Sequence, residues 1–228
     1  MQAATQSGAI GEQPSPLGMA CTLASIVLEF DERCKIMGFI GSILPIASAL
    51  VIYTARILEL RKRREVEKGE VRESLTLRLF IAIGTLMLLG SIAENLWFRP
   101  ALRPTLFAAG WACALLSFWL RRRAIRELGK MWSLNVEIRE SHRLVVSGPY
   151  RWVRHPAYTS MVLELFSFGL LLGSGFTSAA VALLFVPTLI ARIRIEEAAL
   201  SQKIDGYSQY QRSTPALVPY KFPGAAHS

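Results

Sequence analysis

Cysteine and histidine are both scarce in this sequence of 228 residues, which contains three of each. Cys21, Cys34 and Cys113 are odd in number, widely spaced and without the pattern of metal ligands, so neither a disulfide framework nor a zinc site is indicated. No internal repeat is evident. The sequence therefore predicts a protein without a bound metal.

Long polar stretches are also few, because 52% of the residues are hydrophobic, a share typical of membrane proteins rather than of average soluble domains. Five apolar stretches are each near the ~20 residues that a hydrocarbon core of ~30 Å requires of a helix. They cover roughly residues 36–58, 77–98, 102–120, 157–174 and 176–191. We predict an all-α, polytopic integral membrane protein with about five transmembrane helices.

Acidic residues are outnumbered, with 17 Asp and Glu against 26 Lys and Arg and a net charge of +9. The basic residues gather in segments 61–74, 121–156 and 192–228, and the alternate loops hold few of them. Short cytoplasmic loops retain positive charge, so these three segments are expected to face the cytoplasm, with the N-terminus outside. This topology and the binding of anionic membrane lipids explain the charge, and no nucleic-acid partner is predicted.

These features divide the chain into three regions. Residues 1–35 are expected to form a disordered tail followed by a short interfacial helix, because the apolar run 17–30 is too short to span a bilayer. Residues 36–120 are expected to form three transmembrane helices. Residues 121–228 then form the candidate catalytic region, with a transmembrane helical hairpin over 157–191 and a cytoplasmic C-terminal segment.

The most informative segment, residues 142–158, lies between apolar stretches and reads HRLVVSGPYRWVRHPAY. Its histidines, arginines and tyrosines suit a small polar ligand held at a membrane surface. The sequence Gly173-Ser174-Gly175 leaves room for only a tight turn between the two helices that follow. Since antiparallel helices rise equally per residue, His155 should lie level with Glu196, and the two motifs should meet at the membrane boundary.

The facing motif comprises Arg192, Glu196 and Glu197. Arg192 and Glu196 are four residues apart and share one helix face, and the simplest interpretation is a surface ion pair. Opposite the first motif, however, the carboxylates can hold a cationic, hydroxyl-bearing ligand while the arginine binds an anionic acceptor. The equal rise of the two antiparallel helices also places Glu164 opposite Pro187. Glu164 could line a cavity there, or it could be protonated and hydrogen-bonded in a structural role, and the sequence leaves both interpretations open.

Two motifs carry a family resemblance: H-x-L-V-x-x-G-x-Y-x-x-x-R-H-P-x-Y at 142–158 and R-x-x-x-E-E-x-x-L at 192–200. Together they resemble the isoprenylcysteine carboxyl methyltransferases and, more loosely, the membrane phospholipid methyltransferases. The upstream sequence LGKMWS at 128–133 is similar to that family's approach to the same site. The resemblance covers roughly residues 110–220. It implies a cytoplasmic-side pocket for S-adenosylmethionine between segment 135–158 and the end of the fifth span.

The resemblance also implies roles for individual residues. The expected cofactor-binding residues are Asn135, His142, Leu144, Val145, Tyr150, His155, Pro156, Tyr158 and Glu196. Arg192 is expected to bind the acceptor, with Glu197 as a second candidate substrate-binding residue. Arg192 and His155 are the candidate catalytic residues.

We therefore predict an S-adenosylmethionine-dependent membrane methyltransferase that methylates a prenylcysteine-like or other lipophilic carboxylate. A carboxylate is already nucleophilic at neutral pH and needs no general base. Methylation of an ethanolamine phospholipid is the alternative, and its amine would need His155 or Glu197 as a base. A sterol-type membrane reductase and a non-catalytic membrane scaffold are more distant alternatives.

Overall fold

The computed structural model describes residues 41–59, 61, 70–73, 75–129, 132, 136–138 and 144–220, with backbone alone for 70–73 and 136–138. All of these residues belong to one compact unit, residues 41–228. The predicted tail and interfacial helix over residues 1–35 lie outside the described residues.

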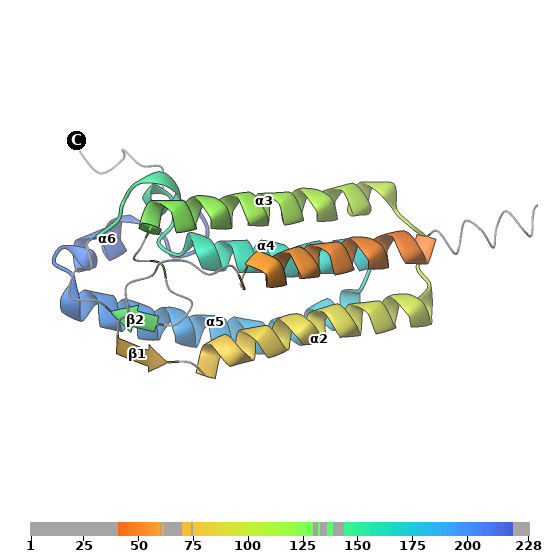
Figure 1. Ribbon diagram of the computed structural model, residues 1–228, viewed down its shortest axis with the longest axis horizontal. Helices are drawn as coiled ribbons and strands as arrows, with labels where there is room; N and C mark the ends of the chain where they lie inside the picture. Colours follow the sequence, from red (N-terminus) through yellow and green to blue (C-terminus); the bar gives the residue numbers. More distant parts are fainter. Residues whose placement is uncertain are drawn as a thin grey trace, which may run out of the picture. The chain divides into compact units, whose positions relative to one another are not determined.

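Long helices run side by side along most of this unit (Figure 1). They are the helix Gly41–Glu59, α2 (Leu75–Phe98), α3 (Pro104–Leu128), α4 (Pro156–Leu172) and α5 (Gly175–Lys203), and the short α6 (Tyr207–Ser213) follows. Gly41–Glu59, α2 and α5 are long and apolar enough to cross a membrane, and α4 is a shorter apolar helix. The prediction of a helical integral membrane protein is therefore confirmed.

Prolines and glycines set the ends of the helices that matter most for the site. Pro104 and Pro156 stand at the starts of α3 and α4, where the missing N–H has no helical partner to lose. Gly173 ends α4 with a left-handed backbone (φ 64°), which glycine adopts without a Cβ penalty. Because α5 begins at Gly175, the predicted tight hairpin between these two helices is confirmed.

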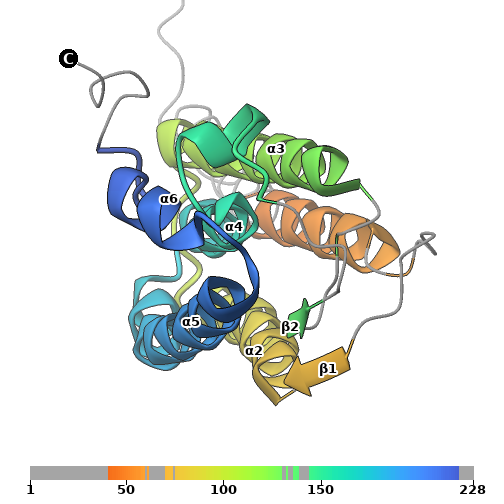
Figure 2. The ribbon, with the colours of Figure 1, turned by 90° about the vertical axis from the view of Figure 1, so that its left-hand side faces the viewer.

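A short antiparallel strand pair joins two loops at the end of the bundle that also carries α6 (Figure 2). Strand β1 (Glu70–Glu73) pairs with β2 (Val136–Ile138), with Val71 opposite Glu137. Strand β2 also packs against α5. The sequence analysis did not predict this pair, which ties the chain just before α2 to the loop between α3 and the 3-10 turn η2 (Gly148–Arg151).

Helix α4 packs most extensively against α3. An ideal Cβ added to Gly110 of α3 would lie 2.7 Å from Leu171 Cγ, so the absence of a side chain at Gly110 permits this close approach. At the middle of the contact, Ser117 Oγ donates a hydrogen bond to the carbonyl oxygen of Ser160 at 2.7 Å. Both serines are completely buried.

Glu164 does not face Pro187 as predicted but binds Arg56 of the helix Gly41–Glu59. Arg56 Nε donates to Glu164 Oε2 at 2.8 Å, and Arg56 also binds Glu59 and Ser117. The equal rise of the two hairpin helices predicts how far along its helix a residue lies, but it does not predict the direction of the side chain. That direction follows from the position of α4 between α5 and the other helices.

Candidate functional site

The two sequence motifs meet at the end of the bundle where α4 begins. His155 and Tyr158 come from the start of α4, and Arg192, Glu196 and Glu197 come from the last three turns of α5. Helix α5 continues without a break to Lys203, well beyond the predicted end of the fifth span at residue 191. The continuous helix holds the three α5 side chains rigidly beside the start of α4, as the equal rise of the two hairpin helices predicts.

The hydroxyl of Tyr158 connects the arginine of the second motif to one of its carboxylates. Arg192 Nε donates a hydrogen bond to Tyr158 Oη at 2.8 Å, and Tyr158 Oη donates to Glu196 Oε2 at 2.5 Å. Among the described contacts, Tyr158 therefore bridges Arg192 and Glu196. The simplest interpretation of the sequence was instead a direct surface ion pair between these two residues. Glu196 is also 3.9 Å from His155 Nδ1, and the rings of His155 and Tyr158 are stacked at 5.4 Å.

Arg192 is buried, with 4% of its surface exposed, although it is charged. Its Nη1 donates a hydrogen bond to Thr76 Oγ1 at 2.6 Å, and its guanidinium lies 5.8 Å from the ring centre of Phe80 and 5.9 Å from that of Tyr158. Thr76 and Phe80 belong to the first two turns of α2. Neither residue could be predicted from the sequence as part of the site, because a threonine and a phenylalanine at the start of an apolar helix give no signal of their own.

Glu197 has a different environment from Glu196, although the two are adjacent. Its Oε1 accepts hydrogen bonds from Arg154 Nε at 2.8 Å and lies 2.9 Å from His155 Nε2, and its Oε2 accepts from Gln211 Nε2 at 2.8 Å. The side chain of Glu197 is 12% exposed, whereas that of Glu196 is 31% exposed. Glu197 thus binds protein groups through both oxygens, and Glu196 keeps the more open carboxylate.

The segment after α6 is fixed to the start of α4 by backbone and side-chain hydrogen bonds. The amides of Arg154 and His155 donate to the carbonyl oxygens of Pro215 and Ala216 at 2.9 and 3.0 Å. The guanidinium of Arg154 also binds the carbonyl oxygens of Gln211 and Thr214. Arg154 therefore joins Glu197 of α5 to the last turn of α6 and to the residue that follows it.

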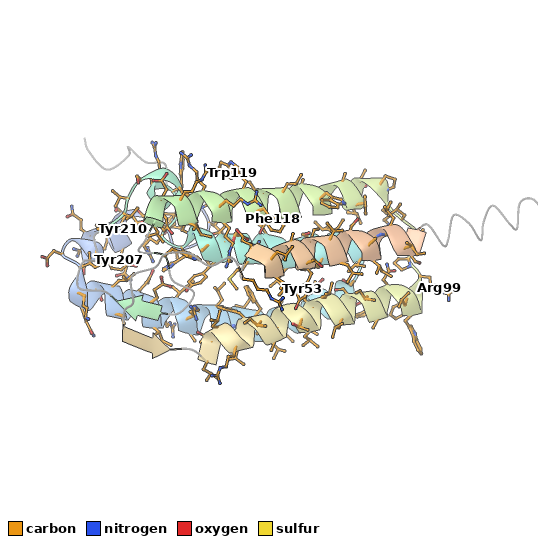
Figure 3. The ribbon with its side chains drawn as sticks, in the orientation of Figure 1. Tyr53, Arg99, Phe118, Trp119, Tyr207 and Tyr210 are labelled. Carbon is orange, nitrogen blue, oxygen red and sulfur yellow. The ribbon has the colours of Figure 1, made fainter. Side chains whose placement is uncertain are left out.

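Three tyrosines lie beside this segment, and Figure 3 shows two of them, Tyr207 and Tyr210, on α6 at the opposite end of the bundle from Arg99. Tyr210 Oη donates a hydrogen bond to the carbonyl oxygen of Tyr150 at 2.5 Å. Burial raises the pKa of all three phenols well above the usual value near 10, and the charge of Glu196 adds to this for Tyr150 and Tyr207. They are neutral hydrogen-bonding groups at physiological pH.

The other predicted site residues fall into two groups. Pro156 is fully buried, and Leu144 packs against the small cluster of Ile204, Tyr207 and Tyr210. Val145 is half-buried in the adjoining segment. Asn135 and His142 lie outside the described residues. Within the described part of the chain, no group of three or more His, Cys, Asp or Glu side chains is placed to hold a metal ion.

Comparison with known proteins supports the resemblance seen in the two motifs. Residues 110–202 match the family model described as the isoprenylcysteine carboxyl methyltransferase (ICMT) family. This part of the chain is therefore similar to the isoprenylcysteine carboxyl methyltransferases. The family region contains α4, nearly all of α5 and every residue of the Arg192–Tyr158–Glu196 connection, whereas Thr76 and Phe80 lie outside it.

Three relatives illustrate the range of proteins that this chain is similar to. The chain is 31% identical to protein-S-isoprenylcysteine O-methyltransferase of Schizosaccharomyces pombe, over 49% of this chain and 48% of the relative. It is 29% identical to protein-S-isoprenylcysteine O-methyltransferase B of Arabidopsis thaliana, over 57% and 68%. It is also 32% identical to the cobalt-zinc-cadmium resistance protein CzcN of Cupriavidus metallidurans, over 46% and 49%. The match to CzcN thus spans about half the length of that relative.

Proposed function

We propose that this protein is an S-adenosylmethionine-dependent membrane methyltransferase that methylates the carboxylate of a lipophilic acceptor, such as a prenylcysteine. The observation that carries the proposal is the connection Arg192–Tyr158–Glu196, in which one helix face presents a buried guanidinium and a partly exposed carboxylate one turn apart. The match of residues 110–202 to the model of the isoprenylcysteine carboxyl methyltransferase family supports it.

The described residues fit the chemistry of this cofactor. S-adenosylmethionine supplies an electrophilic methyl group on a cationic sulfonium, together with a ribose that carries two hydroxyls. The rings of Tyr158 and Tyr150 suit a cation, since an aromatic face attracts a cation by roughly 0.5–2 kcal/mol depending on desolvation. Glu196 suits the ribose hydroxyls, because it has the more exposed carboxylate of the pair. His155 stacks on Tyr158 and fixes its ring.

Arg192 is the group best suited to the acceptor. Its guanidinium is buried beside apolar and aromatic side chains of α2, α4 and α5, where a carboxylate would be attracted far more strongly than in water. A carboxylate that binds there arrives ionised and needs no base. The barrier to methyl transfer then falls mainly through alignment of the acceptor and exclusion of water.

Glu197 has a supporting role in this proposal rather than a contact with substrate. Both of its oxygens bind Arg154, His155 or Gln211, so it holds the first motif and α6 together. The proposal also places the cofactor pocket at the cytoplasmic face of a protein with about five spans, in accord with the basic segments of the sequence.

Binding and transfer can be tested on the purified protein in detergent. Calorimetry should detect binding of S-adenosylhomocysteine, and S-adenosylmethionine labelled in its methyl group should yield a labelled ester with N-acetyl-S-farnesylcysteine or another lipophilic acid. An ester is lost on mild base treatment, whereas a methylated amine is not. Absence of S-adenosylhomocysteine binding would overturn the proposal, and base-stable label on an ethanolamine phospholipid would replace the carboxylate with an amine.

A further inference from the structure

The bond between Arg192 and Thr76 links the candidate acceptor site to a helix outside the family region. Arg192 Nη1 and Thr76 Oγ1 are 2.6 Å apart, and the two residues are 116 positions apart in the chain. Both are buried, with exposed fractions of 4% and 7%. A short hydrogen bond from a charged donor in a buried setting is among the stronger kinds in proteins.

Helices α2 and α4 together restrict the guanidinium of Arg192. Its Nε binds Tyr158 of α4, its Nη1 binds Thr76 of α2, and the rings of Phe80 and Tyr158 lie within 6 Å of its central carbon. An arginine side chain has many rotamers in the absence of such contacts. Two hydrogen bonds to different nitrogens fix both the position and the plane of the group, which a contact with Tyr158 alone would not do.

The strand pair helps to hold Thr76 in place. Strand β1 ends at Glu73, three residues before Thr76, and pairs with β2, which packs against α5 near the same end of the bundle. The first turn of α2 is thereby tied to the loop between α3 and η2 as well as to α5.

We propose that Thr76 is a positioning residue for the acceptor: its hydroxyl orients Arg192 so that the guanidinium presents a fixed fork to the acceptor carboxylate. The inference rests on the proposed function and deepens it, because it adds the first turn of α2 to the acceptor side of the site. Thr76 acts through Arg192 and has no role in binding the cofactor.

The test compares two substitutions, one that removes the hydroxyl and one that keeps it. Thr76→Val keeps the shape and removes the hydroxyl, and Thr76→Ser keeps the hydroxyl and removes a methyl group. We expect Thr76→Val to weaken binding of N-acetyl-S-farnesylcysteine and to lower kcat/KM for it by about tenfold, as the loss of one oriented charged contact does. S-adenosylhomocysteine affinity should stay within about twofold of the parent value, and Thr76→Ser should restore acceptor binding.

A matched control is Thr85→Val on the same helix. Thr85 Oγ1 binds Tyr53 Oη at 3.0 Å and the carbonyl oxygen of Ile81, with no described contact to Arg192. This variant should keep the parent affinities for both probes. If Thr85→Val and Thr76→Val lower acceptor binding equally, the effect is a general loss of packing in α2, and the positioning role is refuted.

A double-substitution cycle separates a positioning role from a structural one. If Thr76 acts through the guanidinium, Thr76→Val should change kcat/KM by less than about twofold when Arg192→Lys is already present. Additive losses would overturn the inference while leaving the proposed function intact, as would a Thr76→Val protein with parental acceptor binding. Failure of the parent protein to bind S-adenosylhomocysteine would instead overturn the proposed function and the role of Thr76 with it.

Discussion

The hydroxyl of Tyr158 lies between the guanidinium of Arg192 and the carboxylate of Glu196. It accepts a hydrogen bond from Arg192 and donates one to Glu196. If Glu196 binds the cofactor and Arg192 the acceptor, Tyr158 is the described group that joins the two halves of the site. A change at either charged residue then alters the hydrogen bonding of Tyr158. The consequences of each substitution should nevertheless differ, because the two charged groups serve different ligands.

Glu196→Gln should weaken the binding of S-adenosylhomocysteine. A hydrogen bond to a charged group contributes about 1.5–3 kcal/mol, so the dissociation constant should rise by roughly 10-fold to 150-fold. Calorimetry on the purified variant measures this change. Parental affinity in Glu196→Gln would remove Glu196 from the cofactor site.

Arg192→Lys should spare the cofactor and damage turnover. The lysine keeps the charge but cannot bind Tyr158, Thr76 and a carboxylate with one rigid fork. We expect kcat/KM to fall by a factor on the order of ten to a hundred, or ~1.4–3 kcal/mol, with S-adenosylhomocysteine binding retained. Labelled-methyl transfer at saturating cofactor gives the rate, and calorimetry gives the affinity.

The pH dependence of the parent enzyme provides an independent check on the acceptor. A carboxylate is fully ionised from neutrality upward, so the rate should stay flat there, whereas an amine acceptor should gain rate as the pH approaches its pKa. Retained turnover in Arg192→Lys together with a rate that climbs above neutral pH would favour the phospholipid amine.

At the scale of elements, the side chain of Arg154 binds both the last turn of α6 and the chain after it, and the loss of these bonds can be measured. Arg154→Lys should lose the bonds to Gln211 and Thr214 and weaken the pair with Glu197, at a cost on the order of 2–3 kcal/mol of stability. Hydrogen exchange at the amides of residues 154 and 155 should accelerate. Arg151→Lys is the matched control, since Arg151 is exposed and lies over the ring of Trp152. Equal exchange in both variants would contradict the role of Arg154.

Burial of tyrosines around α6 predicts a loss of stability in alkali. The pKa of Tyr207 is raised above its unfolded value near 10, so the folded state binds more protons than the unfolded state above that pH. The free energy of unfolding should therefore fall as pH rises above about 10. Thermal unfolding can be followed between about pH 8 and 11. The midpoint temperature should decline less steeply with pH in Tyr207→Phe than in the parent protein. Tyr220→Phe is the control and should show the parental decline, because Tyr220 is 70% exposed. Identical declines in all three proteins would contradict this cause.

The sequence could predict the elements that periodicity and turn residues determine. The Gly173-Ser174-Gly175 turn predicted the hairpin, and the equal rise of its helices brought His155 beside Glu196. The sequence could not predict which helix each side chain faces: Glu164 binds Arg56 from a separate helix. Thr76 was missed for the same reason, because its role depends on packing between residues 116 positions apart.

For the whole molecule, the topology proposal places the α6 end in the cytoplasm and the loop before α3 outside. Both Ala101 and Ser208 are small and exposed, and they lie in the loop before α3 and in α6. In a background with Cys21, Cys34 and Cys113 replaced by serine, Ala101→Cys should react with an impermeant maleimide in intact cells. Ser208→Cys should react only after the membrane is opened. Reaction of Ser208→Cys in intact cells would place the site on the wrong side for a cytosolic cofactor.

The attachment of Pro215 and Ala216 to the start of α4 also bears on the order in which the site is assembled during synthesis. A ribosome adds residues 214–217 to the chain after α2, α4 and α5, so the amides of Arg154 and His155 gain these partners last. The sequence of the helical hairpin is complete before the segment that binds the start of α4 exists. Closure of this end of the bundle therefore follows the synthesis of the membrane helices.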